Sequence, residues 1–384
     1  MVKRLMQAAE YVRVEAGSGV FLMAAAFLAM VAANSPLVGW YKGLTHAHVG
    51  PIDLHLLVND GLMAIFFLVV GLEIKREIFE GELSSMKRAL LPGLAAVGGM
   101  LVPALIYVAF NLGEGGYIRG WAVPTATDIA FSLGILSLFG NKVPISLKIF
   151  LTALAIIDDL LAVLAIAAFY TSQISWIHLG LAFLILGVLA FLAYRGVKSL
   201  WVFLLPGLPL LYLVYQSGVH ATIAGVLLAM VIPLRSRNDD EDSPLVQLEH
   251  ALHTPVAYGV LPIFAFFNSG VPVTGLRPAD FQEPVTLGVL LGLFVGKQVG
   301  VFALCWALIK AKVAELPQHV SWGQFYGISA LTGVGFTMSL FIGGLAYSDE
   351  HTKELAKVGV IGGSLLSALL AATLFYVFRD SEPD

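Results

Sequence analysis

The stretch PISLKIFLTALAIIDDLLAVLAIAAFY, residues 144–170, decides the class of this protein. It is apolar except near its ends and at one central point, and it exceeds the roughly 20 residues that a helix needs to cross a bilayer. The central point holds two adjacent carboxylates, Asp158 and Asp159. A charged side chain at the centre of a membrane span costs roughly 2.5–3.5 kcal/mol on insertion scales, so such residues are rarely without a role. We therefore expect these two aspartates to handle a cation.

The composition places the chain among integral membrane proteins. Of its 384 residues, 58% are hydrophobic and 12% are charged, and the mean hydropathy is +0.85. Soluble domains do not have this composition. The one cysteine, Cys305, lies in an apolar run, which excludes an intramolecular disulfide and a thiolate metal site.

Apolar runs along the chain predict an all-α membrane protein of about twelve transmembrane helices. The expected spans are residues 17–34, 59–80, 90–110, 121–139, 144–170, 177–194, 199–215, 218–234, 256–273, 286–309, 324–347 and 355–378. They leave no room for a soluble domain, so residues 1–384 are expected to form a single transmembrane domain.

The basic residues predict the orientation of these spans. Most Lys and Arg residues fall on the side that holds both termini, and basic loops stay in the cytoplasm, so both termini are expected there. The longest polar segment on that side, residues 235–255, contains the acidic run DDED at 239–242. We interpret this run as a solvated connector, the usual behaviour of a block of like charges.

Two spans contain residues that weaken a helix near the middle of the membrane. The fourth span reads WAVPTATD at residues 121–128, and the eleventh reads LTGVGFT at residues 331–337. Both are expected to unwind there. They occupy matching positions in spans 3–5 and 10–12, which would enter the membrane from opposite sides. The pattern predicts inverted-topology repeats with two discontinuous, crossed helices, an arrangement that in secondary transporters surrounds the substrate site.

Five ionisable side chains lie inside the expected spans away from their ends. Four are expected near the middle of the membrane, namely Asp128, Asp158, Asp159 and Lys297, and Asp60 lies nearer one end of its span. If the broken helices cross, Asp128 can neutralise two helix N-termini and Lys297 two C-termini. Direct participation of Asp128 and Lys297 in transport is an equally good interpretation. A carboxylate can hold a proton or a hard cation, and Thr127 with unwound carbonyls can complete the cation's oxygen shell.

Other titratable residues lie at the ends of spans. His220 begins the eighth span, where a pH switch and a hydrogen-bonded interfacial histidine are both reasonable interpretations. Glu73, Arg76 and Glu77 end the second span with the i,i+3 and i,i+4 spacing of an ordinary ion-pair cluster, for which pH sensing is the alternative.

Several short motifs occur together in one order along the whole chain. They are ND at 59–60, GLEIKRE at 71–77, ATDIAF at 126–131, AIIDDL at 155–160, SGVHAT at 217–222, LEH at 248–250, GK at 296–297 and GVGFTMS at 333–339. In these motifs the chain resembles the bacterial sodium/proton antiporters of the NhaA family, whose members have inverted repeats. The resemblance implies a pH-regulated, electrogenic secondary antiporter of the bacterial inner membrane that exchanges sodium or lithium for protons by alternating access.

The same resemblance implies roles for individual residues. Asp158 and Asp159 would bind the transported cation or protons, with Asp159 as the central ligand, Thr127 beside the site and Lys297 paired with Asp158. Asp128 and Lys297 would balance the crossed helix ends. The pH response would involve Glu73, Arg76, Glu77, His220, Glu249, His250 and His253, and Asp60 and Gly335 would also be associated with transport.

The resemblance implies no cofactor and no nucleic-acid partner. The substrates would be sodium, lithium and protons, the surroundings a lipid bilayer, and a homodimer is allowed. There are two departures from the family. Gln298 follows Lys297 where the best-known relatives have proline, and the loop at 35–58 is short compared with relatives that use it as a dimer-forming β-hairpin.

Three other functions fit a membrane protein with buried aspartates. A proton-coupled carrier of an organic substrate is disfavoured by a midplane rich in Asp, Thr and Gly. An intramembrane aspartyl protease needs two facing aspartates, whereas neighbours on a helix do not face each other, so the chain is not expected to be an enzyme. A channel is opposed by the buried Lys297 and by the lack of a repeated filter motif.

Overall fold

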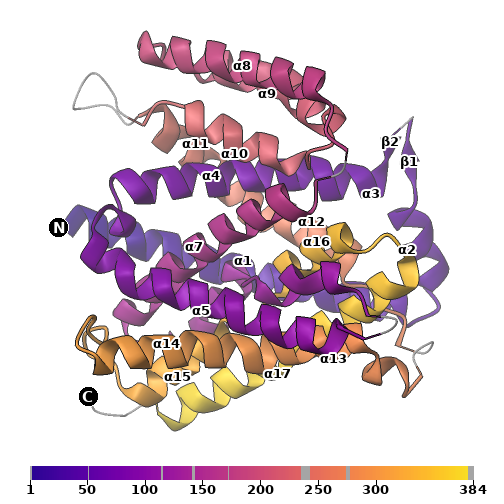
Figure 1. Ribbon diagram of the computed structural model, residues 1–384, viewed down its shortest axis with the longest axis vertical. Coiled ribbons are helices and arrows are strands. Elements are labelled where there is room, and N and C mark those ends of the chain that lie inside the picture. The colour runs from indigo at the N-terminus through magenta and orange to yellow at the C-terminus, as the bar shows by residue number, and fades with distance from the viewer. Residues whose placement is uncertain are drawn as a thin grey trace. The chain divides into compact units, whose positions relative to one another are not determined.

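The computed structural model describes residues 2–50, 52–113, 116–140, 143–171, 173–234, 243–273 and 277–378 (Figure 1). Regular structure in these residues is helical except for two short antiparallel strands, β1 (His48–Val49) and β2 (Ile52–Asp53). The prediction of a helical membrane protein is therefore confirmed at the level of class.

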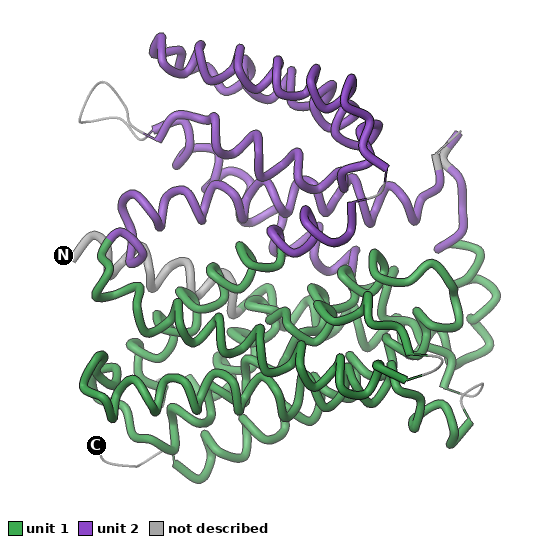
Figure 2. Tube along the Cα trace, in the orientation of Figure 1, with its two compact units in different colours: residues 1–44, 85–162, 265–384 green, residues 45–84, 163–264 purple. Residues whose placement is uncertain are grey.

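The chain divides into two compact units, which Figure 2 colours separately. Unit 1 comprises residues 1–44, 85–162 and 265–384, and unit 2 comprises residues 45–84 and 163–264. Two of the divisions fall inside helices, namely α7 (Ile145–Phe169) and α12 (Leu261–Asn268).

Unit 1 contains the elements that carry the buried charges. Besides most of α7, it contains α1 (Val2–Ala33), α2 (Val38–Thr45), α5 (Met86–Asn111), the 3₁₀ segment η3 (Ile118–Thr125), α6 (Ile129–Ser137), η7 (Asp280–Gln282), α13 (Pro284–Leu291), the π-helical segment η8 (Gly292–Lys297), α14 (Gln298–Lys310), α15 (Trp322–Leu331), α16 (Phe336–Ala346) and α17 (Glu350–Val377). Helix α5 packs closely on α14, because a Cβ on Gly98 would overlap the carbonyl oxygen of Gly300. This contact brings the backbone of α5 next to the helix that follows Lys297.

Unit 2 is built around the contact of α4 (Met63–Phe79) with α10 (Thr222–Val231). A Cβ on Gly225 would overlap the Ala64 carbonyl, so glycine permits this close approach. The other helical elements of unit 2 are α3 (Leu54–Leu56), the π-helical segment η1 (Leu57–Leu62), the 3₁₀ turn η2 (Glu82–Ser84), α8 (Trp176–Tyr194), α9 (Leu200–Gln216), α11 (Pro244–Pro255) and the π-helical segment η5 (Val256–Val260).

Eight helical stretches among the described residues are long and apolar enough to cross a membrane. They are Leu54–Phe79, Met86–Asn111, Ile145–Phe169, Trp176–Tyr194, Pro244–Asn268, Pro284–Lys310, Trp322–Ala346 and Glu350–Val377. A ninth is the pair Gly17–Ala33 and Val38–Thr45 if this pair, bent by 118°, counts as one span. Leu200–Gln216 and Thr222–Val231 are shorter apolar helices. These elements cover eleven of the twelve expected spans, and the fourth consists of η3 and α6 instead of one long helix.

The polar segment at 235–255 is helical in its second half. Helix α11 begins at Pro244, so Glu249, His250 and His253 lie on a helix. Ser243 caps this helix by accepting a hydrogen bond from the Val246 N–H, and proline is well tolerated at a first helical position. The acidic run at 239–242 lies outside the described residues.

The loop at 35–58 is short but also contains regular secondary structure. It holds α2 and the β1–β2 pair, in which His48 lies opposite Asp53 and Val49 opposite Ile52. Gly50 between the strands has a φ of 64°, a conformation that glycine adopts without strain.

Two helical segments of unit 1 are interrupted where proline and glycine predicted it. Between η3 and α6, Ala126 and Asp128 have extended backbones with ψ of 150° and 103°. Between α15 and α16 the helix stops at Leu331 and resumes at Phe336. The Asp128 N–H donates to the Val334 carbonyl at 2.7 Å, so the two interruptions lie side by side.

Candidate functional site

A buried ion pair joins α7 to the π-helical segment η8. Lys297 Nζ donates a hydrogen bond to Asp158 Oδ2 at 2.7 Å, and the two side chains are 0% and 2% exposed. Each charge costs several kcal/mol to desolvate, and the partner offsets this cost only while the contact lasts. Any event that separates the two groups leaves a buried charge in need of another partner.

Two further groups lie at this pair. Asp159 is 5% exposed and lies close enough to act electrostatically on Lys297. Thr127, 1% exposed, contacts the Asp158 carboxylate through its side chain and backbone, and its hydroxyl donates to the Thr332 carbonyl at 2.9 Å. The structure thus brings together the two aspartates, Thr127 and Lys297, the residues that the family resemblance implied for the site.

The oxygen atoms gathered here are of the kind that hard cations bind. Within the described ranges no group of three or more His, Cys, Asp and Glu side chains converges as a metal site would. Carboxylate, hydroxyl and carbonyl oxygens are nevertheless the ligands that hard cations prefer. With one ammonium already bound to a carboxylate, such a site can exchange one positive charge for another.

Asp128 holds the first turns of two helices. It is 2% exposed and caps α6 by accepting from the Phe131 N–H at 2.9 Å. Its other oxygen accepts from the Thr337 N–H at 3.0 Å and from the Thr337 hydroxyl. A carboxylate between the N-termini of α6 and α16 fits the predicted neutralisation of helix dipoles. The matching role for Lys297 at helix C-termini stays a prediction, since the hydrogen bond described for its ammonium goes to Asp158.

Gly335 allows the two interruptions to meet. It precedes α16, and a Cβ at this position would lie 2.8 Å from the Ala126 carbonyl oxygen and 2.7 Å from Leu293 Cδ2. Because real Cβ atoms do not approach so closely, any larger residue would push the interruptions apart.

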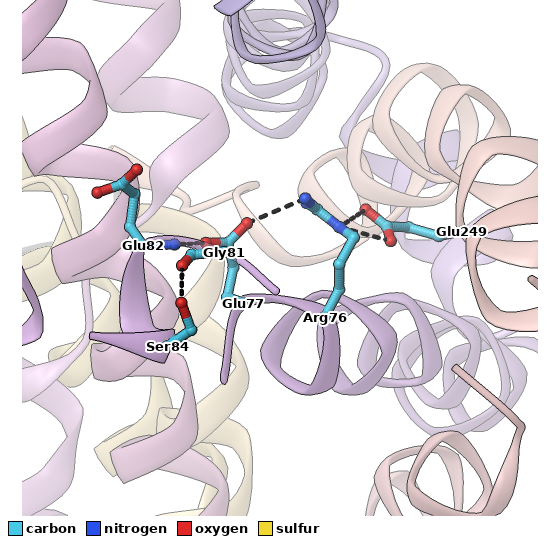
Figure 3. Close-up of polar contacts among 6 residues, drawn as sticks. All are labelled: Arg76, Glu77, Gly81, Glu82, Ser84 and Glu249. Carbon is cyan, nitrogen blue, oxygen red and sulfur yellow. Dashed lines mark hydrogen bonds and ion pairs between the residues drawn. The ribbon is translucent and has the colours of Figure 1, made fainter. Parts of the chain in front are cut away.

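A second charged cluster lies in unit 2, at the end of α4 (Figure 3). Arg76 Nε lies 3.0 and 2.9 Å from the two carboxylate oxygens of Glu249, and Arg76 Nη1 lies 3.0 Å from Glu77 Oε1. The Glu249 side chain is 4% exposed, whereas that of Arg76 is 30% exposed. Glu73 is also buried and acts electrostatically on Arg76. One arginine therefore interacts with three acids.

Glu77 connects this cluster to the turn that follows α4. Its Oε2 accepts from the Glu82 N–H at 2.8 Å, and the Ser84 hydroxyl donates to the Gly81 carbonyl at 2.6 Å (Figure 3). A change in the charge of Glu77 would therefore act on the backbone of this turn as well as on Arg76.

The two histidines of α11 do not share one environment. His250 is exposed and His253 is half-buried, four residues after Glu249. Residues four apart share a helix face while adjacent ones do not. His253 therefore lies on the same face as Glu249, and His250 points away from it.

His220 and Asp60 form a pair that the sequence did not reveal. His220 Nε2 lies 3.4 Å from Asp60 Oδ1, and its Nδ1 lies 2.9 Å from the Thr222 hydroxyl. Asp60 lies on the π-helical segment η1, as Lys297 lies on η8. Such segments are frequent at functional sites.

The fold and the site together define a multi-pass α-helical membrane protein with charged groups buried among its helices. The chain belongs to the Na+/H+ antiporter 1 family, whose model matches residues 9–375. It is 53% identical over 386 residues to the Na+/H+ antiporter NhaA of Caulobacter vibrioides, covering 100% of this chain and 93% of that protein. It is 52% identical over 370 residues to the NhaA of Rhizobium etli, covering 95% and 94% of the two chains.

Proposed function

We propose that this protein is a pH-regulated, electrogenic secondary antiporter that exports sodium or lithium in exchange for protons by alternating access. The observation that carries the proposal is the buried pair of Lys297 and Asp158 with Asp159 and Thr127 beside it. Membership of the family indicates that the exchanged ions are sodium and protons, and the two aspartates are carboxylates that can bind either ion.

In the proposed cycle, Asp159 is the central ligand and Lys297 occupies Asp158 while the cation is absent. An arriving sodium ion displaces the proton of Asp159 and the Lys297 ammonium, which gives up its proton. Reprotonation of Asp159 and of the Lys297 amine then releases the cation and restores the pair with Asp158. Since a carboxylate and an amine can together take up more protons than the one cation that they release, the exchange would move net charge.

The proposed architecture is one transmembrane domain of twelve spans in residues 1–384, with both termini on the cytoplasmic side of a bacterial inner membrane. Spans 3–5 and 10–12 would form the inverted repeats, and η3–α6 and α15–α16 the crossed helices whose N-termini Asp128 neutralises. The adjacent interruptions and the Asp128 hydrogen bonds support this arrangement. The β1–β2 pair is consistent with a homodimer of the kind that the family resemblance allows.

We further propose that Glu73, Arg76, Glu77, Glu249, His250 and His253 set the pH response, with His220 and its partner Asp60 contributing. The support is the cluster of three acids on Arg76 and its link to the turn after α4. Gly335 would act by keeping the interruptions together.

Proton flux in proteoliposomes tests the proposed function. Adding sodium or lithium to one side should draw protons to that side from the other, whereas adding potassium should not. The flux should respond to an imposed membrane potential, because the exchange moves net charge. Proton movement with potassium, or none with any of the three cations, would contradict the assignment.

A further inference from the structure

Gln298 is a buried amide whose two polar atoms both have partners. It directly follows Lys297, at the junction of η8 and α14, and is 5% exposed. Its Nε2 donates to the Phe294 carbonyl, and its Oε1 accepts from the Tyr326 hydroxyl at 2.6 Å. A buried amide that is hydrogen-bonded through both its nitrogen and its oxygen has one defined orientation.

The hydrogen bond to Phe294 lies at a distortion of the backbone beside Lys297. In a regular α-helix the Gln298 N–H would donate to the carbonyl four residues earlier, that of Phe294. Here it donates to the Val295 carbonyl, three residues earlier, as in a 3₁₀ turn, directly after the π-helical segment η8. The side chain of the same residue donates to the Phe294 carbonyl. Gln298 thus stabilises the irregular turn that carries Lys297.

The hydrogen bond from Tyr326 ties this turn to α15. The surrounding contact between α14 and α15 is aromatic, with the Phe302 ring edge-on to Tyr326 at 5.0 Å and to Trp322 at 5.9 Å. The amide and the hydroxyl therefore make a polar contact beside apolar rings. Since α15 is the first half of an interrupted helix, the contact links that half to the turn that carries Lys297.

We propose that Gln298, held by Tyr326, is a positioning residue that keeps the Lys297 ammonium on Asp158 and so sets how readily sodium displaces it. This inference rests on the proposed function. The charged groups that act on Lys297 are Asp158 and Asp159, both on α7. On the side of α5, the neighbour of the ammonium is Gly99, which carries no charge.

Two variants and a matched control test the proposal. Gln298→Met removes both hydrogen bonds at similar size, Tyr326→Phe removes one, and Tyr212→Phe removes a hydroxyl from an exposed tyrosine of unit 2. A less firmly held Lys297 leaves Asp158 more readily, so sodium competes at lower pH. We expect the pH of half-maximal exchange to fall by about 0.5–1 unit in Tyr326→Phe, which corresponds to one hydrogen bond, and by at least as much in Gln298→Met, which loses two. The apparent KM for sodium at the parent's half-maximal pH should fall about threefold to tenfold. The control should match the parent.

Hydrogen–deuterium exchange of the peptides that cover residues 292–300 tests the same contact without transport. The backbone amides of these residues should take up deuterium faster in both variants than in the parent, and not in Tyr212→Phe. A parent that moves no sodium would overturn the proposed function, while the rates of deuterium uptake would still decide the role of Gln298. Unchanged deuterium uptake at 292–300, or an unshifted pH profile in variants that transport, would overturn the inference. If Gln298→Met does not fold, Tyr326→Phe decides alone.

Discussion

Asp128 Oδ2 accepts a hydrogen bond from the Thr337 N–H at 3.0 Å, so a carboxylate on one interrupted segment holds the first turn of the other. Asp128→Ala would leave this N–H and that of Phe131 buried without their acceptor. We expect it to cost about 2–4 kcal/mol, the sum of a lost helix cap and a lost hydrogen bond to a charge. Thr337→Val removes only the hydroxyl contact and should cost about 1 kcal/mol. Equilibrium unfolding in detergent measures both, and equal losses would contradict a role for the Asp128 charge at α16.

Asp349 caps α17 as Asp128 caps α6, but it is exposed. Its charge is expected to make the stability of the protein depend on pH. Hydrogen bonds from the Thr352 N–H and hydroxyl hold the pKa of Asp349 below its usual value. A carboxyl with a lowered pKa in the folded state stabilises it above the pKa of the unfolded chain, and this contribution is lost as the pH falls through the folded pKa. Asp349→Asn should therefore lower the melting temperature at neutral pH and bring it close to that of the parent in acid. A loss of equal size at both pH values would contradict the charge dependence.

The two interruptions and the buried aspartates were predictable, because residues that break a helix or carry a charge stand out in an apolar span. Pro124 lacks a backbone donor, and Gly333 and Gly335 weaken a helix, so local chemistry alone located both breaks. The cost of charge in a membrane likewise singled out Asp158 and Asp159.

Partners far apart in the chain were not predictable from local pattern. Lys297 and Asp158 are 139 residues apart, and Arg76 and Glu249 are 173 apart. The resemblance to known antiporters implied the first pair. The Gln298–Tyr326 contact had no sequence signal, because a π-helical turn depends on tertiary packing. Ser243 and Pro244 did carry a signal for the start of α11, which the polar character of the segment obscured.

Asp159→Asn keeps the size of the proposed central ligand and removes its charge. We expect it to abolish both sodium binding and sodium-driven proton release, because the amide neither titrates nor balances a cation. Calorimetry and proton release from the purified protein measure the two effects. Glu283→Gln, at an exposed acid that starts α13, should behave as the parent. Proton release from Asp159→Asn that equals the parent's would remove Asp159 from the site.

Sodium and protons that share one site should compete. The apparent affinity for sodium is therefore expected to rise with pH and to level off once both aspartates have lost their protons. Isothermal titration at several pH values measures this. Potassium titrations provide a control for ionic strength, and an affinity for sodium that does not change with pH would contradict shared-site exchange.

The cluster at the end of α4 should affect the pH of activity more than the capacity for transport. Glu249→Cys removes the acid that makes two contacts with Arg76, and Glu77→Cys removes the acceptor of the Glu82 N–H. Each is expected to shift the curve of exchange against pH and to leave exchange measurable at the new optimum. The matched control is Glu80→Cys, which removes an exposed acid at the end of the same helix and should leave the curve in place. If either cluster variant instead abolishes sodium binding at every pH, that residue belongs to the ion pathway, and the proposed division between regulation and binding is wrong.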